Sequence, residues 1–463
     1  MTGIADSPVA ALLAFSAATN LGLAGRVVRT DRDAALLSGF GARVDDEGAD
    51  LVLDADGLRL ADGATRGPSA AERIDFARAH MPASRAAAAG LPVRGVRVGL
   101  SLVLEPKTAV LALLLQEAGA EVDVFAFAME TDDAVAAELR RRGVAVHASA
   151  TATPAEERAH ALALLDARPR VLVDDGAHVL RLAHRERPDV VAGMAGASEE
   201  TTSGVRPLEA MHAEHALDVP VIAANDAVTK SWFDNRHGTG ETCVLAIIRV
   251  LGDDLAGRDA VVAGFGPVGE GVAQRLAALG ARVTVADLDP RRALAARFAG
   301  HRVAPLDQAV RTADLVVSAT GAPRTVDAAV LAACAPDAAV AVAGGAPEEV
   351  LPPPATRAER LGPHLERLHL PGGGAVRLLA GGDCVNIVAG EGNPIDVMDL
   401  SFAVQLTAIR RLLGPALPLG VHRLTQDEDR AAAGGGPAPA PSTVDWRRTR
   451  FDLPAGEALQ QDS

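Results

Sequence analysis

The sequence predicts an α/β protein with two doubly wound, Rossmann-like parallel sheets, a small N-terminal appendage and a flexible C-terminal tail. Three observations predict this class. Apolar, strand-like runs alternate with helical patterns from residue 71 onward, and a glycine-rich turn at 264–269 joins a strand to a helix. The segment 431–442 is nearly all Ala, Gly and Pro, which is typical of a flexible linker.

The chain of 463 residues is long enough for two or three domains. We expect the following order along the chain: an appendage at 1–70, a first α/β domain at 71–241 completed by 395–425, a second α/β domain at 242–394, and a linker with a tail at 426–463. In the appendage, a helix is expected at 8–18 and short strands near 27–28, 42–44, 51–53 and 58–60, separated by Asp and Gly.

The composition excludes several classes of function. A net charge of −15 argues against nucleic acid as a partner, because phosphate binding needs clustered Lys and Arg. Cys243, Cys334 and Cys384 have no metal-ligand spacing, so we expect buried reduced thiols and no metal site. The N-terminus lacks a signal-peptide pattern, and no apolar run reaches the roughly 18 residues of a membrane helix. These features indicate a cytoplasmic protein with no membrane partner.

The first α/β domain carries polar groups after several expected strands. The expected strands are 96–104, 122–126, 144–148, 171–174, 190–191 and 219–223, and the expected helices are 72–89, 108–119, 134–142 and 154–167. Parallel sheets bind ligands beyond the carboxyl ends of their strands. Three groups follow such ends: Asp174 to Gly176, Glu199 to Ser203, and Asn225 to Asn235.

The third group reads NDAVTKSWFDN and brings Lys230, Asp234 and Asn235 together within six residues. One interpretation is a polar loop that enters a helix, with Asp234 or Asn235 as its cap. The other is a lysine held close to carboxylates and partly desolvated, so that it acts as a base near neutral pH. The spacing alone leaves both open.

The second α/β domain opens with a strand, a glycine turn, a helix, a second strand and an acid, in that order. Gly264 permits the tight turn, Gly266 lets the backbone approach a pyrophosphate, and Gly269 allows close helix packing. Asp287 follows the second strand and can bind a ribose 2′-hydroxyl, which favours NAD over NADP, although Arg291 and Arg292 lie close. A plain βαβ turn is the alternative. Further strands at 315–320 and 338–343 end in glycine, and a helix at 397–413 returns to the first domain.

Together these strings resemble the S-adenosyl-L-homocysteine hydrolase (adenosylhomocysteinase) family. The resemblance covers about 72–423. The matching strings are DDG at 174–176, SEETTSGV at 198–205, NDAVTKS at 225–231, FDN at 233–235, GFGPVGEG at 264–271 and LLAGGDCVNI at 378–387.

The resemblance implies an enzyme that uses tightly bound NAD to oxidise the 3′-hydroxyl of a nucleoside thioether. The ketone acidifies the 4′ C–H, so the 5′ substituent can leave and water can add before the hydride returns. By this resemblance Lys230 and Asp234 would act on the 3′-hydroxyl, Asp175 and Asn235 would lie on the proton-transfer path, and Glu200 would hold the ribose hydroxyls.

The resemblance also implies an NAD site and a homo-oligomer, a dimer or a tetramer. The residues that would contact NAD are Thr201, Thr202, Ser203, Gly264, Gly266, Pro267, Val268, Gly269, Glu270, Gly271, Asp287, Gly344, Gly345 and Asn386. Residues 242–394 would then be the NAD-binding domain, and 71–241 would be the substrate-binding domain.

The departures from the family pattern gather around the substrate. Val103 replaces a His tied to proton transfer, and Glu105 and Lys107 replace the residues that face adenine. Asn393 replaces the His of a Gly-His-Pro turn that closes over the base, and Glu391 replaces an apolar Met. Other changes are Thr239 for Cys, Gly345 for His, and the tail VDWRRTRF at 444–451 for the usual ending that reaches a neighbouring subunit.

We therefore expect 3′-oxidation chemistry on a different nucleoside-like substrate, bound by Glu200, Glu105, Lys107 and Asn393. The outcome would be elimination, hydrolysis or epimerisation, since charged groups in an adenine pocket are costly unless a polar ligand meets them. Two alternatives stay open: ordinary S-adenosyl-L-homocysteine hydrolysis, and a regulatory protein that binds NAD without catalysis.

Overall fold

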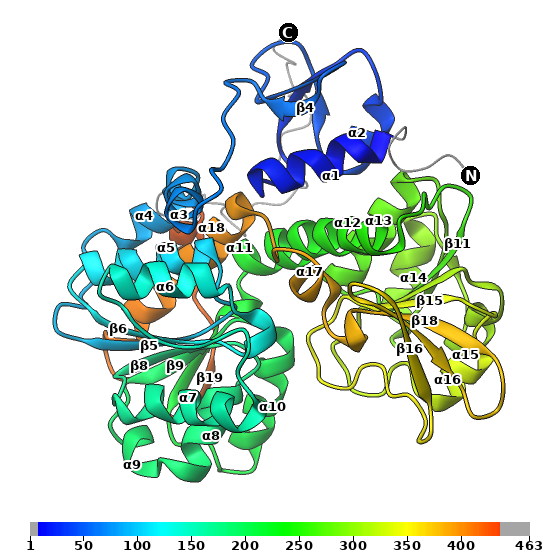
Figure 1. Cartoon of the computed structure of the whole chain (residues 1–463). Helices are drawn as coiled ribbons and strands as arrows, with labels where there is room; N and C mark the ends of the chain where they lie inside the picture. The colour runs from blue at the N-terminus through cyan, green and yellow to red at the C-terminus, as the bar shows by residue number, and fades with distance from the viewer. Residues whose placement is uncertain (1–7, 436–463) are drawn as a thin grey trace, which may run out of the picture.

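The computed structural model describes residues 8–435 and contains three β-sheets, each with its own helices (Figure 1). The fold confirms the predicted α/β class with mostly parallel, Rossmann-like sheets. The tail string VDWRRTRF lies outside the described residues. No helix between residues 8 and 435 is both long and apolar enough to cross a membrane.

The N-terminal segment forms a four-stranded sheet in the order β2-β1-β3-β4, drawn in dark blue in Figure 1. The elements are α1 (Pro8–Thr19), β1 (Val27–Arg29), α2 (Ala34–Gly39), β2 (Arg43–Val44), β3 (Leu51–Asp54) and β4 (Gly57–Leu60). The short strands lie where the sequence predicts them, but α2 was not predicted. Its six residues are too few for a clear helical period.

The second sheet has seven parallel strands in the order β19-β10-β9-β8-β5-β6-β7, with helices on both faces. Its strands are β5 (Arg97–Ser101), β6 (Glu121–Phe125), β7 (Ala145–His147), β8 (Val171–Asp174), β9 (Gly196–Glu199), β10 (Pro220–Ala223) and β19 (Gly420–His422). Its main helices are α5 (Pro106–Glu117), α6 (Asp133–Arg141), α7 (Pro154–Asp166), α8 (His178–Glu186), α10 (Thr202–Ala213) and α18 (Ile395–Leu412).

Two predictions in this region are wrong. The strand expected at 190–191 is instead the helix α9 (Pro188–Val191), because Pro188 suits the first turn of a helix. The strand in this part of the chain is β9 (Gly196–Glu199), which the sequence does not predict because GASE lacks an apolar run. The helix expected at 72–89 is divided into α3 (Ala70–Ala79) and α4 (Pro82–Ala88), because Pro82 cannot continue α3.

The third sheet has eight strands in the order β13-β12-β11-β14-β15-β18-β17-β16. Its strands are β11 (Asp259–Ala263), β12 (Arg282–Ala286), β13 (Arg302–Val303), β14 (Leu315–Ser318), β15 (Ala339–Val342), β16 (Arg357–Gly362), β17 (Leu365–His369) and β18 (Ala375–Leu379). The first six in this order are parallel, and β17 and β16 add an antiparallel edge that the sequence analysis missed. The helix α13 (Pro267–Ala278) follows the glycine turn.

The N-terminal sheet is fixed at the junctions between the two larger units. The backbone amide of Ile395, at the start of α18, donates 2.8 Å to the carbonyl of Asn20. Glu241, at the start of α12 (Gly240–Leu251), accepts a 3.2 Å hydrogen bond from the amide of Leu23. Arg26 forms a 2.8 Å ion pair with Asp396. The N-terminal segment therefore contacts α12 and α18, the two helices that connect the seven-stranded unit with the eight-stranded unit.

Candidate active site

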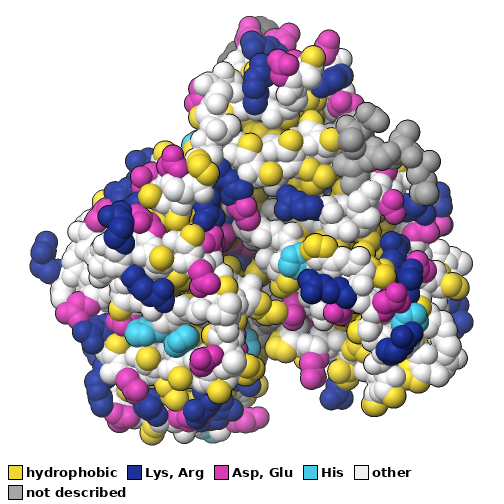
Figure 2. All heavy atoms as spheres, viewed as in Figure 1, with side chains coloured by type: hydrophobic (Ala, Val, Ile, Leu, Met, Phe, Trp, Pro, Cys, Tyr) yellow, Lys and Arg dark blue, Asp and Glu magenta, His cyan; other side chains and the backbone are white. Residues whose placement is uncertain are grey.

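A cavity of about 550 Å³ lies between the two larger α/β units. Figure 2 shows a hollow between these units, beneath the N-terminal sheet. Glu200 and Lys230 line the cavity from the seven-stranded side, and Gly266 and Gly344 line it from the eight-stranded side. The carboxyl ends of both parallel sheets thus share one space, which is where open α/β sheets bind ligands.

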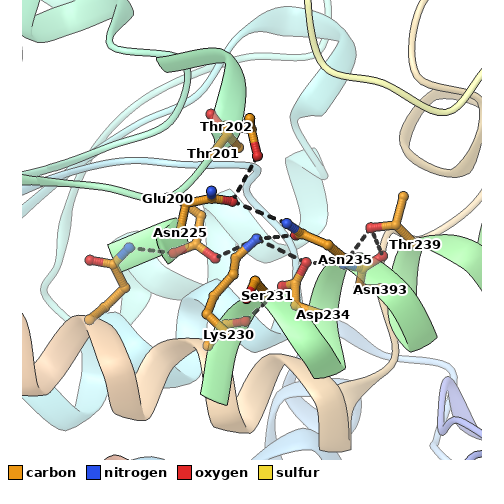
Figure 3. A network of polar contacts seen from close by, with 12 residues as sticks. Glu200, Thr201, Thr202, Asn225, Lys230, Ser231, Asp234, Asn235, Thr239 and Asn393 are labelled. Carbon is orange, nitrogen blue, oxygen red and sulfur yellow. Dashed lines mark hydrogen bonds and ion pairs between the residues drawn. The ribbon is translucent and has the colours of Figure 1, made fainter. Parts of the chain in front are cut away.

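Lys230 stands at the centre of the polar network (Figure 3). Its Nζ lies 3.0 Å from Asp234 Oδ1, 2.7 Å from Asn235 Oδ1 and 3.7 Å from Glu200 Oε1. The segment Ser231–Thr239 is wound as a π-helix, so the residues four and five positions after Lys230 lie on the same face. This rare winding lets one ammonium group meet both partners from a single turn.

The partners of Lys230 are held in turn by distant residues. Asp234 accepts hydrogen bonds from Asn393 Nδ2 at 2.9 Å and from Ser401 Oγ at 2.7 Å. Asn235 Nδ2 donates 3.2 Å to Asn225 Oδ1. Asp234 and Asn235, the two hydrogen-bond partners of Lys230, are therefore each held by a further side chain, which fixes their positions relative to the ammonium.

Glu200 is 5% exposed and carries one unsatisfied oxygen. Its Oε2 accepts a hydrogen bond from Gln405 on α18, whereas its Oε1 has Lys230 at 3.7 Å and no hydrogen-bond donor within residues 8–435. Burial raises the pKa of Glu200 to about 7, against the lowering effect of Lys230. A buried acceptor without a donor is costly, so a ligand hydroxyl that reaches Oε1 would be bound strongly.

Electrostatics keep Lys230 positively charged. Burial opposes the charge, but the carboxylates of Asp234 and Glu200 together outweigh it and raise the pKa of Lys230 above its ordinary value. This arrangement favours a charged lysine over the expected lysine that acts as a base near neutral pH, and the role of Lys230 stays a prediction. The structure instead presents an ammonium group that donates hydrogen bonds.

Lys107 and Lys230 are the only lysines in the sequence; every other basic side chain except histidine is arginine. Both are almost completely buried, with 0% and 3% exposure. Lysine offers a compact ammonium with three donors, whereas arginine offers a planar fork. The chain thus keeps lysine at two buried positions beside this cavity.

The turn after β8 is organised by a carboxylate that the sequence analysis did not single out. Glu199 accepts hydrogen bonds of 2.9 Å from the amides of Gly176, Ala177 and Thr201. Asp174 similarly accepts 2.8 Å from the amide of Leu180. Both carboxylates accept hydrogen bonds from backbone amides and so hold the turn, while Asp175 lines the cavity.

Glu105 and Lys107 form a buried ion pair at the start of α5. Lys107 Nζ lies 2.5 Å from Glu105 Oε2 and donates 2.8 Å to the carbonyl of Glu391. Glu105 lines the cavity, but Lys107 lies behind it and does not. Burial raises the pKa of Glu105 to about 7, although Lys107 acts to lower it. The Glu391 side chain forms an ion pair with Arg66 of the N-terminal segment.

Asn393, expected at the base, joins the two halves of the site. Its Nδ2 donates to Asp234, and its Oδ1 accepts 3.1 Å from Asn386 Nδ2. Asn386 in turn donates 2.9 Å to Thr242 Oγ1. Asn393 also lines the cavity, so it lies between the lysine cluster and the expected cofactor residues.

The glycine turn fits a dinucleotide. A Cβ at Gly269 would lie 1.9 Å from the carbonyl oxygen of Gly264, so the helix packs on the turn only without a side chain. At Gly266 the nearest atom would be 3.5 Å away, and this residue borders the cavity at the N-terminus of α13. Gly269 is thus needed for packing, and Gly266 leaves room for a phosphate.

The other expected cofactor residues divide into two groups. Those that line the cavity are Thr201, Thr202, Ser203, Gly266, Pro267, Val268, Gly344, Gly345 and Asn386. Those that do not are Gly264, Gly269, Glu270, Gly271 and Asp287. Glu270 instead forms an ion pair with Arg236. Asp287 accepts a 2.7 Å hydrogen bond from the amide of Phe265, which holds its carboxylate beside the turn.

Comparisons with known proteins agree with this geometry. Residues 235–392 match the model of the S-adenosyl-L-homocysteine hydrolase NAD-binding domain. The S-inosyl-L-homocysteine hydrolase of Methanopyrus kandleri is 38% identical over 378 residues, which cover 79% of this chain and 89% of the relative. The chain belongs to the S-adenosyl-L-homocysteine hydrolase family. The adenosylhomocysteinase of Thermotoga maritima is 40% identical over 327 residues, covering 70% of this chain and 81% of the relative.

Family membership confirms three predictions. The protein is an NAD-dependent enzyme of the hydrolase type, its cofactor is NAD, and its substrate is nucleoside-like. Relatives of similar identity carry names with different bases, inosyl in one case and adenosyl in the other. Family membership therefore leaves the identity of the base open.

Proposed function

We propose that the protein cleaves a purine nucleoside thioether at its 5′ carbon by transient oxidation of the 3′-hydroxyl, and that the base it selects is a 6-oxopurine. The observation that carries the proposal is the buried Lys230 cluster on the wall shared with the glycine turn. NAD, when bound, accepts and returns a hydride. The residues of this chain bind, orient and move protons.

The ribose would be held by the cluster in a defined way. The free Oε1 of Glu200 accepts a hydrogen bond from a ribose hydroxyl, and Lys230 donates to the 3′ oxygen. The proton of the 3′-hydroxyl passes to the Asp175 carboxylate, which lines the same cavity, as the hydride leaves. Because Lys230 is charged, it stabilises the negative charge that develops on the 3′ oxygen in this step. Asp234, tied to Asn393 and Ser401, keeps the ammonium in position, and Asp175 and Asn235 lie beside it on the proton path.

The base preference is supported by the chemistry of Glu105. A 6-oxopurine carries a hydrogen on N1, which an ionised carboxylate accepts, whereas adenine presents a bare acceptor at N1. Lys107 forms an ion pair with Glu105 from outside the cavity lining, so the carboxylate that contacts the ligand is not buried without a counter-charge. The relative named S-inosyl-L-homocysteine hydrolase carries such a base in its name.

Ordinary S-adenosyl-L-homocysteine hydrolysis is the second candidate, because the 40% identical relative is named adenosylhomocysteinase. Thiol release decides between the two. The NAD-loaded protein is given S-inosyl-, S-adenosyl- and S-guanosyl-L-homocysteine, and free homocysteine is measured. We expect release from the inosyl and guanosyl compounds at least about tenfold faster than from the adenosyl compound. Equal or faster release from the adenosyl compound would reject the base assignment.

Two further outcomes define the limits. No thiol release from any compound, in a protein shown to hold NAD, would favour the regulatory alternative.

We also expect a homo-oligomer, a dimer or a tetramer, which light scattering at micromolar concentration tests directly.

A further inference from the structure

His178 is the only histidine that lines the cavity within the described residues 8–435. It is the first residue of α8 and directly follows the Asp175-Gly176-Ala177 turn. The proposed function does not use it. Its ring packs edge-on against Phe127, with centroids 5.4 Å apart.

The turn before His178 is constrained. Ala177 has φ 55°, in the left-handed region that favours glycine, and the preceding Gly176 has φ 72°. Such a conformation in alanine costs about 1 kcal/mol and persists only where the surroundings impose it. The Glu199 carboxylate stabilises this conformation by accepting hydrogen bonds from the amides of Gly176 and Ala177. A Cβ at Gly176 would lie 2.6 Å from His178 Nε2, so the ring rests directly on this turn.

The same turn connects His178 to the ribose cluster. The amide of Gly176 donates 3.0 Å to Thr201 Oγ1, and Thr201 is next to Glu200 in the sequence. The imidazole therefore lies on the same edge of the cavity as the residues proposed to hold the ribose. Phe127, which contacts the ring, and Glu130 and Val103 line the same cavity.

The ring is electrically suited to accept a proton. Burial lowers the pKa of His178, and Arg181 on the same helix lowers it further, so the ring is neutral at neutral pH. The other titratable groups of this region are the carboxyls of Asp175, Glu130 on the 128–130 turn, Glu157 on α7 and Asp383. Burial raises the pKa of Glu130 to about 8, aided by Asp175 and Glu157, so it is largely an uncharged acid near pH 7.

We propose that His178 is the catalytic residue that carries the proton between the 4′ carbon and the 5′ leaving atom; this rests on the proposed function. After 3′ oxidation, the 4′ C–H bond breaks and its proton moves to the neutral imidazole. The electron pair left on C4′ forms a C4′=C5′ double bond as the bond from C5′ to sulfur breaks; the electron pair of that bond stays on sulfur, and the imidazolium protonates it. For hydration, water gives a proton to the imidazole as its oxygen bonds to C5′, the C4′=C5′ double bond breaks, and the imidazolium returns that proton to C4′.

The test separates oxidation from elimination. In the full-length, NAD-loaded protein, His178→Asn and His178→Gln are compared with His184→Asn, a histidine of the same helix outside the cavity, and with Glu130→Gln. The absorbance of reduced nicotinamide after substrate addition reports oxidation, and thiol release reports elimination. We expect both His178 variants to reduce NAD within about threefold of the wild type but to release thiol about a hundredfold to ten-thousandfold more slowly. His184→Asn and Glu130→Gln should release thiol within about tenfold of the wild type.

The pH profile supplies a readout that a packing role would not move. The wild-type kcat/KM should rise with pH through a limb below the usual histidine value of about 6.5, and this limb should be absent in His178→Gln. Thiol release within threefold of the wild type in both His178 variants, or an unchanged limb, would overturn the proposal and leave the proposed function intact. A loss confined to Glu130→Gln would assign the proton transfer to Glu130 instead. Absence of nicotinamide reduction in the wild type would overturn both.

Discussion

Lys230 Nζ lies 3.0 Å from Asp234 Oδ1 and 2.7 Å from Asn235 Oδ1, because the chain between 231 and 239 is wound as a π-helix. In an ordinary α-helix the residues three and four positions on share a face with the first residue, and the residue five positions on does not. The wider turn adds the fifth. The ammonium is therefore fixed by two partners on one side, while Glu200 lies 3.7 Å away, where a ribose oxygen would enter.

The charge of Lys230 can be measured directly, because the chain contains only two lysines. In protein labelled with carbon-13 at the lysine ε-carbon, two lysine signals should appear. The signal that disappears in Lys230→Met should titrate above the ordinary value of about 10.4, since the carboxylates of Asp234 and Glu200 raise its pKa. A transition near pH 7 to 8 would instead restore the view of Lys230 as a neutral base.

Glu105 should make base selectivity depend on pH. Its pKa is about 7, so above that pH the carboxylate is ionised and accepts the N1 hydrogen of a 6-oxopurine. Below it, the protonated acid can donate to the N1 of adenine. The ratio of kcat/KM for S-inosyl- over S-adenosyl-L-homocysteine should therefore rise as pH increases from 6 to 8. Glu105→Gln should flatten the ratio, since an amide does not titrate; an equal slope in this variant would contradict the assignment.

Two glycines of the cofactor turn should respond differently to alanine. Gly269→Ala places a methyl carbon 1.9 Å from the oxygen of Gly264, so the free energy of unfolding should fall by about 3 kcal/mol. Gly266→Ala meets no atom closer than 3.5 Å, so the NAD-free protein should keep its stability within about 0.5 kcal/mol. It should nevertheless bind NAD at least about tenfold more weakly, because the methyl group occupies the phosphate approach.

Urea unfolding and NAD titration check these two effects separately. Gly372→Ala is the control, because no atom lies within 4 Å of its added methyl group. Unchanged NAD affinity in Gly266→Ala would show that the pyrophosphate does not approach this backbone.

Stability should fall with rising pH, owing in part to Glu241. Burial raises the pKa of this carboxyl to about 7, above its ordinary value near 4.5. The folded state therefore binds the proton more tightly than the unfolded state, and this stabilisation is complete below about pH 4.5 and lost as pH rises through about 7. Urea midpoints should decrease from pH 5 to 8, and less steeply in Glu241→Gln. Glu47→Gln, in an exposed turn, should keep the wild-type slope; identical slopes in all three proteins would exclude this contribution.

The order of strings in the sequence was enough to predict the α/β class, the glycine turn and the cofactor. These features depend on the spacing of residues that are close together in the sequence, so they can be recognised without the structure. The Lys230 cluster was also visible, since its first partners lie within five residues. Its outer partners were not, because Ser401 and Gln405 lie more than 160 positions away on α18.

A signal for those partners existed in the helix. Ser401 and Gln405 are polar residues four positions apart on an otherwise apolar, fully buried stretch. Polar side chains are buried only with partners, so their spacing indicated a common target. The strand β9 was missed for the opposite reason. Its Ser198 and Glu199 are buried by hydrogen bonds to Gln405 and to the turn after β8, and a search for apolar runs ignores such a strand.

In the proposed function, Lys230, Asp234 and Glu200 support reversible oxidation of a ribose hydroxyl. Rapid mixing of the NAD-loaded protein with S-inosyl-L-homocysteine, followed by near-ultraviolet absorbance, tests it most directly. We expect reduced nicotinamide that appears within the first turnover and declines as thiol is released. Lys230→Met, with its NAD content verified, should reduce at least about a hundredfold more slowly. Thiol release by the wild type with no reduced nicotinamide, or reduction at the wild-type rate in Lys230→Met, would contradict it.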